Sequence, residues 1–314
     1  MSKNSHTLLG LLAGALLLPG VSIAEAQETH GNAVAESMLV RDISFGSDLA
    51  RKGDMALVGI NAINSVRFGI PDYWDVQGEP ELHLDVARSA MLIPDVSAIT
   101  VWADGRPVGT FSLDEDPAEV DEVVIKLPLQ AENGYHTLQF WAYHRSRLPC
   151  ELSDHPGLWS RILESSFVRV RYKPQTPELS LSKWPHPLRD DRDPDPARVV
   201  LLLPKDPSEE EVQAAGYVAS YLGHISGWRP MDMYVHQGSL RTAPAGHVVV
   251  IARSDAPSAG LSDLRSILAN EDGELGDAAT MLKGSGMPAA GLLTLSPRPG
   301  SPMRSVLGVV GKSG

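Results

Sequence analysis

A proline-rich segment between Pro174 and Pro196 divides the chain into two stretches with different hydrophobic patterns. The segment holds six prolines and a charged run over 189–193. Because proline fixes φ and removes a backbone donor, such a segment cannot lie inside a helix or a sheet. The stretch before it reads as short alternating strands, and the stretch after it as buried strands alternating with helices. We therefore predict a linker over 174–197 that joins two separately cored domains.

The first 26 residues have the features of a secretory signal peptide. Lys3 precedes an apolar core over 8–23, and Ala24-Glu25-Ala26 is a small-x-small cleavage site. Pro19 and Gly20 interrupt the apolar core, which favours cleavage over a retained N-terminal anchor. We expect a periplasmic protein whose residues 27–39 form a flexible segment.

The charge and cysteine content exclude several classes of protein. Lys plus Arg number 27 and Asp plus Glu number 39, a net charge of −12, which argues against nucleic acid or an anionic lipid surface as the main partner. Cys150 is the single cysteine, so the chain has no internal disulfide. We expect it to be a packed thiol.

Residues 40–173 alternate apolar and polar side chains with a period of two, the pattern of half-buried strands. We expect strands over 81–86, 99–103, 109–113, 120–127, 137–143 and 167–172. Asp104-Gly105 is a hairpin turn signal. Several short strands with little helical periodicity predict an antiparallel β-sandwich or jelly roll.

Strand parity identifies three aromatic side chains opposite the aliphatic faces of their strands. Trp141 and Tyr143 lie opposite Leu138 and Ala142, and Trp102 lies opposite the aliphatic residues of its own strand. An outward Trp or Tyr offers a flat apolar surface with a polar tip, which suits stacking against a sugar ring. Burial of this face by the other sheet, a loop or a neighbouring domain is the competing and more common outcome. The three aromatics are our carbohydrate-contact candidates.

Residues 198–314 read as strands over 199–203, 231–235, 247–252, 291–295 and 305–310, with helices between them. Ser208 and Glu211 form a capping box that begins a helix reaching about residue 225. Its predicted buried stripe comprises Val212, Ala215, Val218, Ala219 and Leu222. A second helix is expected over 261–269. This alternation predicts an open, mostly parallel, three-layer sheet that is flavodoxin-like or Rossmann-like.

Only residues 311–314 follow the last expected strand, so we expect a truncated gene product or a fragment. Gly311-Lys312-Ser313 resembles the end of a P-loop, but Val306 stands where that motif begins with glycine. The first strand-to-helix turn, over 204–208, has no glycine with which to approach a phosphate. We predict no nucleotide site in this domain.

Motifs for catalysis or metal binding are also missing from the sequence. No G-x-S-x-G serine elbow is present. His136, His144 and His155 have no spacing or Glu partner typical of zinc sites, and we expect them to be surface or loop histidines. The carboxylate pairs Asp114/Asp116 and Asp121/Glu122 are expected in solvated loops. We therefore assign no catalytic residue, metal or cofactor.

Several stretches follow one another in an order that is more distinctive than any one of them. They are Leu92–Ser97, Ile99–Val108, the stretch from Cys150 through Leu158–Ile162 to Ser165, Trp184–Pro187, and Ala214–Gly223. With a signal peptide, a jelly-roll module and a flavodoxin-like module, this order resembles the periplasmic regulatory subunit of bacterial cellulose synthase, a family often labelled cyclic di-GMP-binding. The resemblance covers nearly all of the mature chain.

The resemblance implies a non-catalytic accessory subunit that contacts the emerging glucan and docks on the catalytic subunit of a membrane glucan synthase. It also implies an indirect link to cyclic di-GMP, because the clear site for that activator belongs to the synthase's own cytoplasmic domain. The chain departs from the family in having one module pair and no C-terminal anchor, and Asp104 stands where Asn is usual. A homo-oligomer is left open, and a secreted glycoside hydrolase and a periplasmic solute-binding protein are the alternatives.

Overall fold

The computed structural model describes residues 37–49, 53–113, 120–129, 133–146, 155–227, 229–268 and 292–311. These residues all belong to one compact unit that spans Val34–Gly314. The signal peptide, Asp114, Asp116, Cys150, Lys312 and Ser313 lie outside the described residues. Among the described residues, no helix has both the length and the apolar character needed to cross a membrane.

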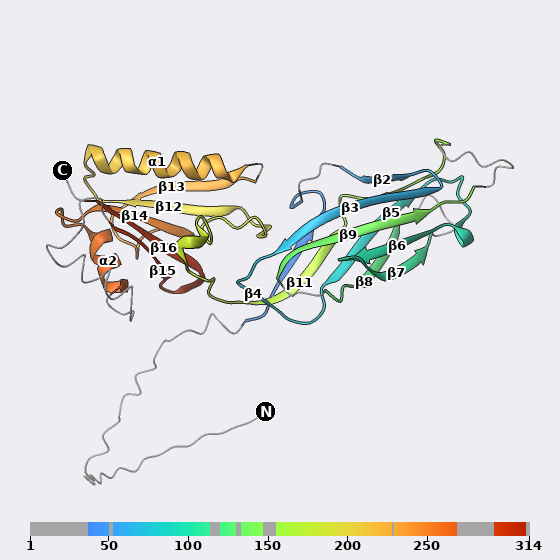
Figure 1. Ribbon diagram of the computed structural model, residues 1–314, viewed down its shortest axis with the longest axis horizontal. Coiled ribbons are helices and arrows are strands. Elements are labelled where there is room, and N and C mark those ends of the chain that lie inside the picture. Colours follow the sequence, from blue (N-terminus) through green and yellow to red (C-terminus); the bar gives the residue numbers. More distant parts are fainter. Residues whose placement is uncertain are drawn as a thin grey trace, which may run out of the picture. The chain divides into compact units, whose positions relative to one another are not determined.

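The first half of the chain forms an antiparallel β-sandwich (Figure 1). The seven-stranded sheet comprises β1 (Leu39–Ser44), β2 (Met55–Val58), β4 (Trp74–Val76), β5 (Glu81–Arg88), β8 (Asp121–Lys126), β10 (Trp159–Ile162) and β11 (Phe167–Pro174). The four-stranded sheet has the order β3 (Asn61–Ile70), β9 (Gly134–Tyr143), β6 (Ala98–Ala103) and β7 (Arg106–Ser112). A short 3-10 turn, η1 (Pro94–Val96), precedes β6. The predicted sandwich class is confirmed.

The sandwich core is built by alternation along each strand. In β5 every second side chain is buried, including Leu82 and Val86, and in β9 the same holds for Leu138 and Phe140. These residues belong to one hydrophobic cluster that both sheets share. The parity predicted for the strand over 137–143 is therefore confirmed. Asp121 and Glu122 lie on β8, within the strand predicted over 120–127, so the solvated loop expected for this carboxylate pair is wrong.

The turn between β6 and β7 forms at Asp104-Gly105, where the sequence predicted a hairpin. Both residues adopt positive φ angles, 48° and 78°, which Asp and Gly tolerate better than other residues. The register shifts between Val101 and Trp102, so a bulge interrupts the pairing of β6 with β7, which resumes where Trp102 pairs with Pro107.

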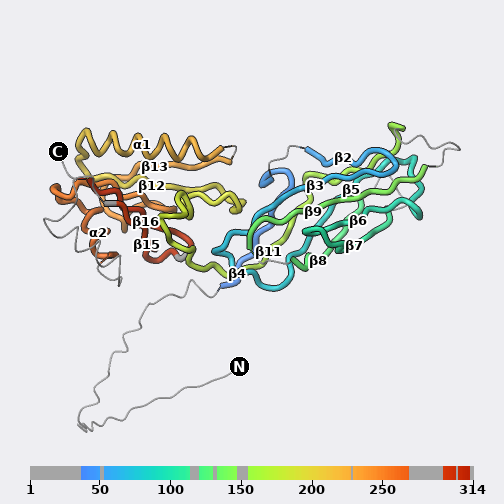
Figure 2. The backbone as a smooth tube through the Cα atoms, in the orientation of Figure 1, coloured from blue at the N-terminus to red at the C-terminus, as the bar shows by residue number. Residues whose placement is uncertain are grey.

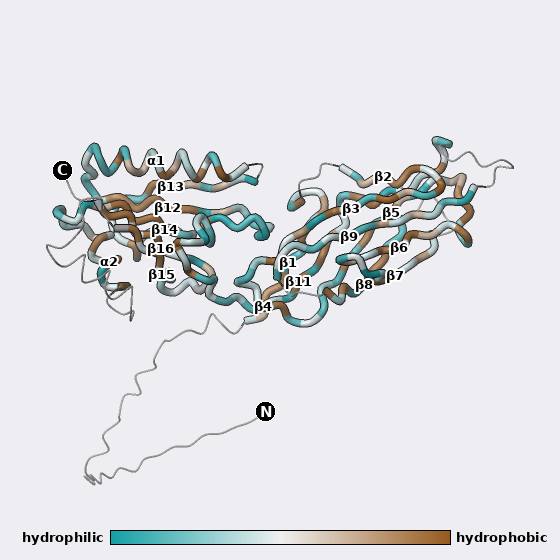
Figure 3. Tube along the Cα trace, in the orientation of Figure 1, coloured by the Kyte–Doolittle hydropathy of each residue, from teal (hydrophilic) through white to brown (hydrophobic). Residues whose placement is uncertain are grey.

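The second half of the chain forms a five-stranded sheet in the order β13-β12-β14-β16-β15. Its strands are β13 (Met231–Gln237), β12 (Ala197–Leu203), β14 (His247–Arg253), β16 (Ser301–Gly311) and β15 (Leu292–Arg298). The first four are parallel, and β15 is antiparallel to β16. Figure 3 shows β12 and β14 as continuous hydrophobic stretches, which is expected for strands covered on both faces.

Two helices, α1 (Glu209–Ser226) and α2 (Ala259–Leu268), pack on opposite faces of this sheet (Figure 1). One part of the predicted stripe of α1 is wrong, because Val212 is 51% exposed. The buried residue of that turn is Glu211, whose carboxylate accepts hydrogen bonds from Ser208 N at 2.8 Å and Arg253 N at 3.1 Å. The first turn of α1 therefore buries a bonded acid in place of an apolar side chain.

The proline-rich segment follows β11 and leads into β12 (Figure 2), and several of its side chains pack against or bond to the rest of the described chain. Leu179, Trp184 and Leu188, around the 3-10 turn η2 (Leu181–Lys183), pack into the core on the α1 side of the five-stranded sheet. Further on, Asp193 accepts a short hydrogen bond from the Tyr73 hydroxyl, and Asp195 accepts one from Arg41 at 3.0 Å.

Candidate functional site

The outward side of the four-stranded sheet carries the three aromatic residues that strand parity had selected. Trp141 on β9 lies between Ile63 on β3 and Thr100 on β6. We call this surface the neutral face, and define it by Asn61, Ile63, Ser65, Ala98, Thr100, Trp102, Thr110, Ser112, Gln139, Trp141 and Tyr143. None of these side chains is charged.

The aromatic residues of the neutral face are accessible. Trp141 is 43% exposed and Tyr143 is 40% exposed, and Trp102 is half-buried. Two residues along a strand span roughly 7 Å, so Trp141 and Tyr143 are close neighbours. Trp102 pairs with Gln139 and is therefore the diagonal neighbour of Trp141, roughly 7–8 Å away. The fold thus brings all three candidates together on one surface.

The remaining side chains of the neutral face are neutral hydrogen-bonding groups and two aliphatic side chains, Ile63 and Ala98. Ile63 is 63% exposed, and the hydroxyls of Thr100 and Thr110 are hydrogen-bonded to each other at 3.0 Å. Exposed rings beside hydroxyl and amide groups can stack on a sugar ring while bonding its hydroxyls. The face has the chemistry to bind an uncharged polysaccharide, and nothing in it suits catalysis.

A buried histidine fixes the hairpin next to the neutral face. His136 Nδ1 lies 2.8 Å from Asp104 Oδ2, and the other carboxylate oxygen of Asp104 accepts a bond from Thr137 N at 2.8 Å. These contacts tie the β6–β7 turn to β9 and so hold Trp102 at its place beside Gln139.

The expectation of a surface or loop histidine is wrong for His136, which is buried on β9, whereas His144 follows β9 in an irregular segment but is also buried. His144 Nδ1 lies 2.7 Å from Gly59 O and Nε2 lies 3.0 Å from Ser160 Oγ. Burial lowers the pKa of His144, and the bond to Gly59 opposes that shift. His144 is a bonded core residue.

One cluster of possible metal ligands occurs among the described residues, formed by Asp72, His186 and Asp190. A guanidinium already lies within it, since Arg192 Nη2 is 3.1 Å from Asp72 Oδ2 and 2.7 Å from Asp190 Oδ2. The bonds to Asp190 hold the pKa of Arg192 above its usual value. The position of a cation is thus taken by a side chain of the protein.

The N-terminus of α1 is the natural place for a phosphate in a sheet of this kind. Here the carboxylate of Glu211 accepts the hydrogen bonds from Ser208 N and Arg253 N. An internal anion therefore occupies this end of the helix, in agreement with the glycine-free turn seen in the sequence.

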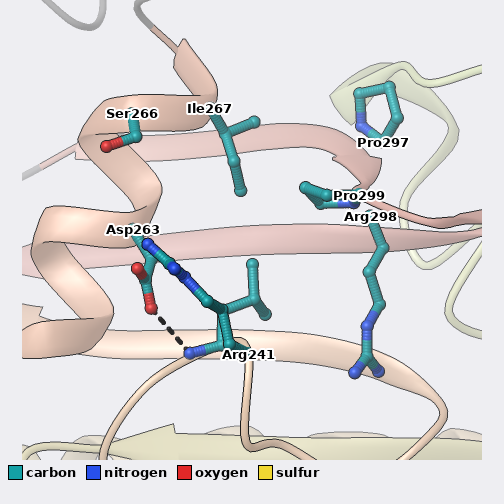
Figure 4. A pocket seen from close by; sticks show the side chains of 8 residues that line it. Arg241, Asp263, Ser266, Ile267, Pro297, Arg298 and Pro299 are labelled. Atoms are coloured by element: carbon teal, nitrogen blue, oxygen red, sulfur yellow. Dashed lines mark hydrogen bonds between the residues drawn. The ribbon is translucent and has the colours of Figure 1, made fainter. Parts of the chain in front are cut away.

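A cavity of about 510 Å³ lies between α2 and the β15–β16 turn (Figure 4). Two of its charged side chains, Asp263 and Arg298, are already bonded within the chain. Asp263 accepts a hydrogen bond from Leu240 N at 2.7 Å, and Arg298 donates to the carbonyls of Ala243 and Pro244 at 3.0 and 2.8 Å. The neutral face is therefore the stronger candidate.

Comparison with known proteins identifies a family that both halves of the chain match. The family model described as "Cellulose synthase BcsB, first CBM domain" matches residues 41–174, and "Cellulose synthase BcsB, first FD domain" matches residues 180–314. The chain is 27% identical over 218 residues to "Putative cellulose synthase 2" of Komagataeibacter xylinus, which is 69% of this chain and 14% of that protein. It is 26% identical over 209 residues to the "Cyclic di-GMP-binding protein" of Pseudomonas fluorescens, which is 66% of this chain and 27% of that protein.

The chain thus spans less than a third of the length of these curated relatives. Among solved structures, a family 35 carbohydrate binding module from an environmental isolate matches at 18% identity and a TM-score of 0.21, over 36% of this chain and 66% of that chain. A similarity this low supports no inference.

Proposed function

The chain belongs to the cellulose synthase BcsB family, and from this premise we propose that it is a non-catalytic accessory subunit that contacts the glucan made by a membrane synthase. The neutral face is the observation that carries the proposal. A nascent glucan is an uncharged polymer of flat rings with equatorial hydroxyls, and it needs stacking surfaces and neutral hydrogen-bonding groups. Trp102, Trp141 and Tyr143 are the proposed contact residues.

The domain arrangement that we propose is a sandwich over 40–173, a linker over 174–197 and a flavodoxin-like domain over 198–314. The order β13-β12-β14-β16 supports the last assignment, because a flavodoxin-like sheet also has its first strand between its second and third. The antiparallel edge strand β15 is an addition to that pattern. Because the carboxylate of Glu211 already lies at the N-terminus of α1, where a phosphate would otherwise bind, we propose that the domain serves as a structural or docking module.

The proposed location is the periplasm, with the catalytic subunit of the synthase as the protein partner. The apolar N-terminal stretch over 8–23 supports the proposed location, and the names of relatives such as "Cellulose synthase 2" support the proposed partner. Several relatives are named "Cyclic di-GMP-binding protein", and we propose for this chain only an indirect link to cyclic di-GMP.

The proposal is tested by measuring binding of cellohexaose by calorimetry and of insoluble cellulose by sedimentation. We expect Trp141→Ala to weaken binding by about tenfold or more, since a central aromatic anchor contributes about 2 kcal/mol or more to such interfaces. Tyr143→Ala and Trp102→Ala should each weaken binding less.

Trp159→Ala is the matched control. Trp159 is, like Trp141, an outward tryptophan, but it is half-buried and lies on β10 of the other sheet, where Arg161 packs over its ring at 5.0 Å. Its loss should leave glucan binding unchanged. Binding that survives Trp141→Ala but is lost on Trp159→Ala would move the site to the other sheet and refute the proposal.

A further inference from the structure

A second surface of the protein gathers positive charge in a chain whose net charge is −12. A cavity of about 380 Å³ is lined by Arg67, Tyr135, Arg189, Asp191 and Arg229, with apolar contacts from Leu49 and Ile225. We call it the arginine cavity. Three guanidinium groups face a single carboxylate there, so the lining carries an excess of two positive charges.

Two of the arginines are held by bonds that fix their positions. Arg189 is only 8% exposed, and its Nη2 donates to Ser226 O at 2.9 Å and contacts Asp191 Oδ1 at 2.8 Å. Arg229 donates to the carbonyl of Asp193 and, at 3.5 Å, to that of Asp48. Burial and then the charge of Arg189 lower the pKa of Arg229, so the two cations disfavour each other.

The third arginine is held by stacking. The guanidinium of Arg67 lies 3.8 Å from the centre of the Tyr135 ring, where the ring's quadrupole stabilises it. A purely structural role explains the bonds of Arg189 and Arg229 to backbone carbonyls. It does not explain why Arg67 is held at the wall of the same cavity, where it adds a third positive charge.

We propose that the arginine cavity binds an oxyanion group, such as a phosphate, sulfate or carboxylate, carried by a ligand no larger than a sugar unit. The planar fork of a guanidinium matches the geometry of such groups and forms short charge-assisted hydrogen bonds with them. A bound anion of one or two charges compensates the excess positive charge of the lining. The volume lies at the lower end of the range for small-molecule sites.

The test is calorimetric titration of the full chain, at constant ionic strength, with inorganic phosphate, sulfate, glucuronate and glucose. We expect saturable binding of at least one anion and none of glucose. Binding of phosphate and sulfate alone identifies a tetrahedral anion, whereas binding of glucuronate alone identifies an acidic sugar. Arg67→Gln should weaken the binding by about tenfold or more, because it removes a charge-assisted bond.

Arg106→Gln is the control, since Arg106 is an exposed arginine on β7 that does not line the cavity. It should leave anion binding unchanged, as should Trp141→Ala on the neutral face. A second variant, Tyr135→Ala, removes the ring that holds Arg67 and should also weaken binding. The absence of saturable binding by all three anions, or an equal loss in the Arg67 and Arg106 variants, overturns the proposal.

Discussion

The two outward sides of the sandwich are built by the same alternation but differ in their chemistry. On the seven-stranded sheet, Arg169 donates two hydrogen bonds of 2.8 Å to Asp42, and Arg171 pairs with Glu81 at 3.1 Å. We call this surface the paired face and define it by Asp42, Glu81, His83, Phe167, Arg169 and Arg171. None of the residues that define the neutral face of the four-stranded sheet is charged, and the charge on that side of the sheet lies further along β3, at Arg67.

The two surfaces differ in how far their side chains find bonding or stacking partners within the chain. On the paired face even the aromatic ring of Phe167 is covered. It stacks on His83, with the ring centres 4.5 Å apart, and the guanidinium of Arg169 lies 5.1 Å from the centre of the Phe167 ring. On the neutral face Trp141 and Ile63 leave apolar area in contact with water. A surface whose charged groups and rings already have partners within the chain has few groups left to bind a ligand. Exposed rings, in contrast, lower the free energy of a complex when a partner covers them.

The largest expected effect concerns two consecutive residues of β9 that face opposite ways. Phe140 lies in the core, and Trp141 lies on the neutral face. Phe140→Ala should lower the free energy of unfolding by about 3–5 kcal/mol, because it removes buried area and leaves a cavity. Trp141→Ala should lower it by less than about 1 kcal/mol. Urea denaturation measures both, and comparable losses in the two variants would mean that the neutral face is covered in the folded protein.

A smaller loss is expected at the turn that fixes the edge of the neutral face. Asp104→Ala removes the carboxylate that Thr137 N and the buried His136 bond to. We expect the free energy of unfolding to fall by about 2–3 kcal/mol, because both partners lose a charge-assisted hydrogen bond. Asp104→Asn keeps an acceptor and tolerates the positive φ, so it should cost about 1 kcal/mol or less. Equal losses in the two variants would show that the negative charge of Asp104, which both remove, stabilises the turn, and that neither a neutral acceptor nor tolerance of the positive φ can replace it.

Much of this architecture follows from side-chain alternation, and the exceptions have physical causes. The strands β5, β6, β8, β9 and β11 match the predicted ones. The ten-residue strand β3 was missed because Asn64 stands at an inward position and breaks its apolar series. The strands β2, β4 and β10 have only three or four residues, too few to show a period. In the second half, the predicted strands and helices differ from the observed ones mainly at their ends.

The candidate site was predictable in its residues but not in its arrangement. Parity alone indicated that Trp102, Trp141 and Tyr143 face outward. Their proximity depends on the pairing of β6 with β9, which a single sequence does not reveal. The burial of His136 and His144 was missed for a related reason, since their partners Asp104 and Gly59 lie 32 and 85 residues away.

The smallest effect is expected on the paired face, where Arg169→Gln removes the partner of Asp42. The hydrogen bond from Arg169 holds the pKa of Asp42 below its usual value of 3.8. The pair therefore stabilises the fold at pH values above 3.8, and this contribution is lost as the pH falls below 3.8 and through the pKa of the folded state. Because the pair is partly exposed, Arg169→Gln should lower the free energy of unfolding at neutral pH by about 1 kcal/mol or less. This loss should be smaller in 0.5 M salt, because the screening length is already about 10 Å at roughly one fifth of that ionic strength.

Binding of a neutral glucan has no such electrostatic component, so its affinity for the wild-type chain should stay constant over the same salt range. Chemical denaturation of the wild type and of Arg169→Gln at two salt concentrations, beside calorimetry with cellohexaose, compares the two surfaces directly. A glucan affinity that falls with salt as steeply as the stability difference would mean that charged groups take part in glucan binding. The contrast between the paired face and the neutral face would then be wrong, because ionic contacts would bind the polymer as well as stabilise the fold.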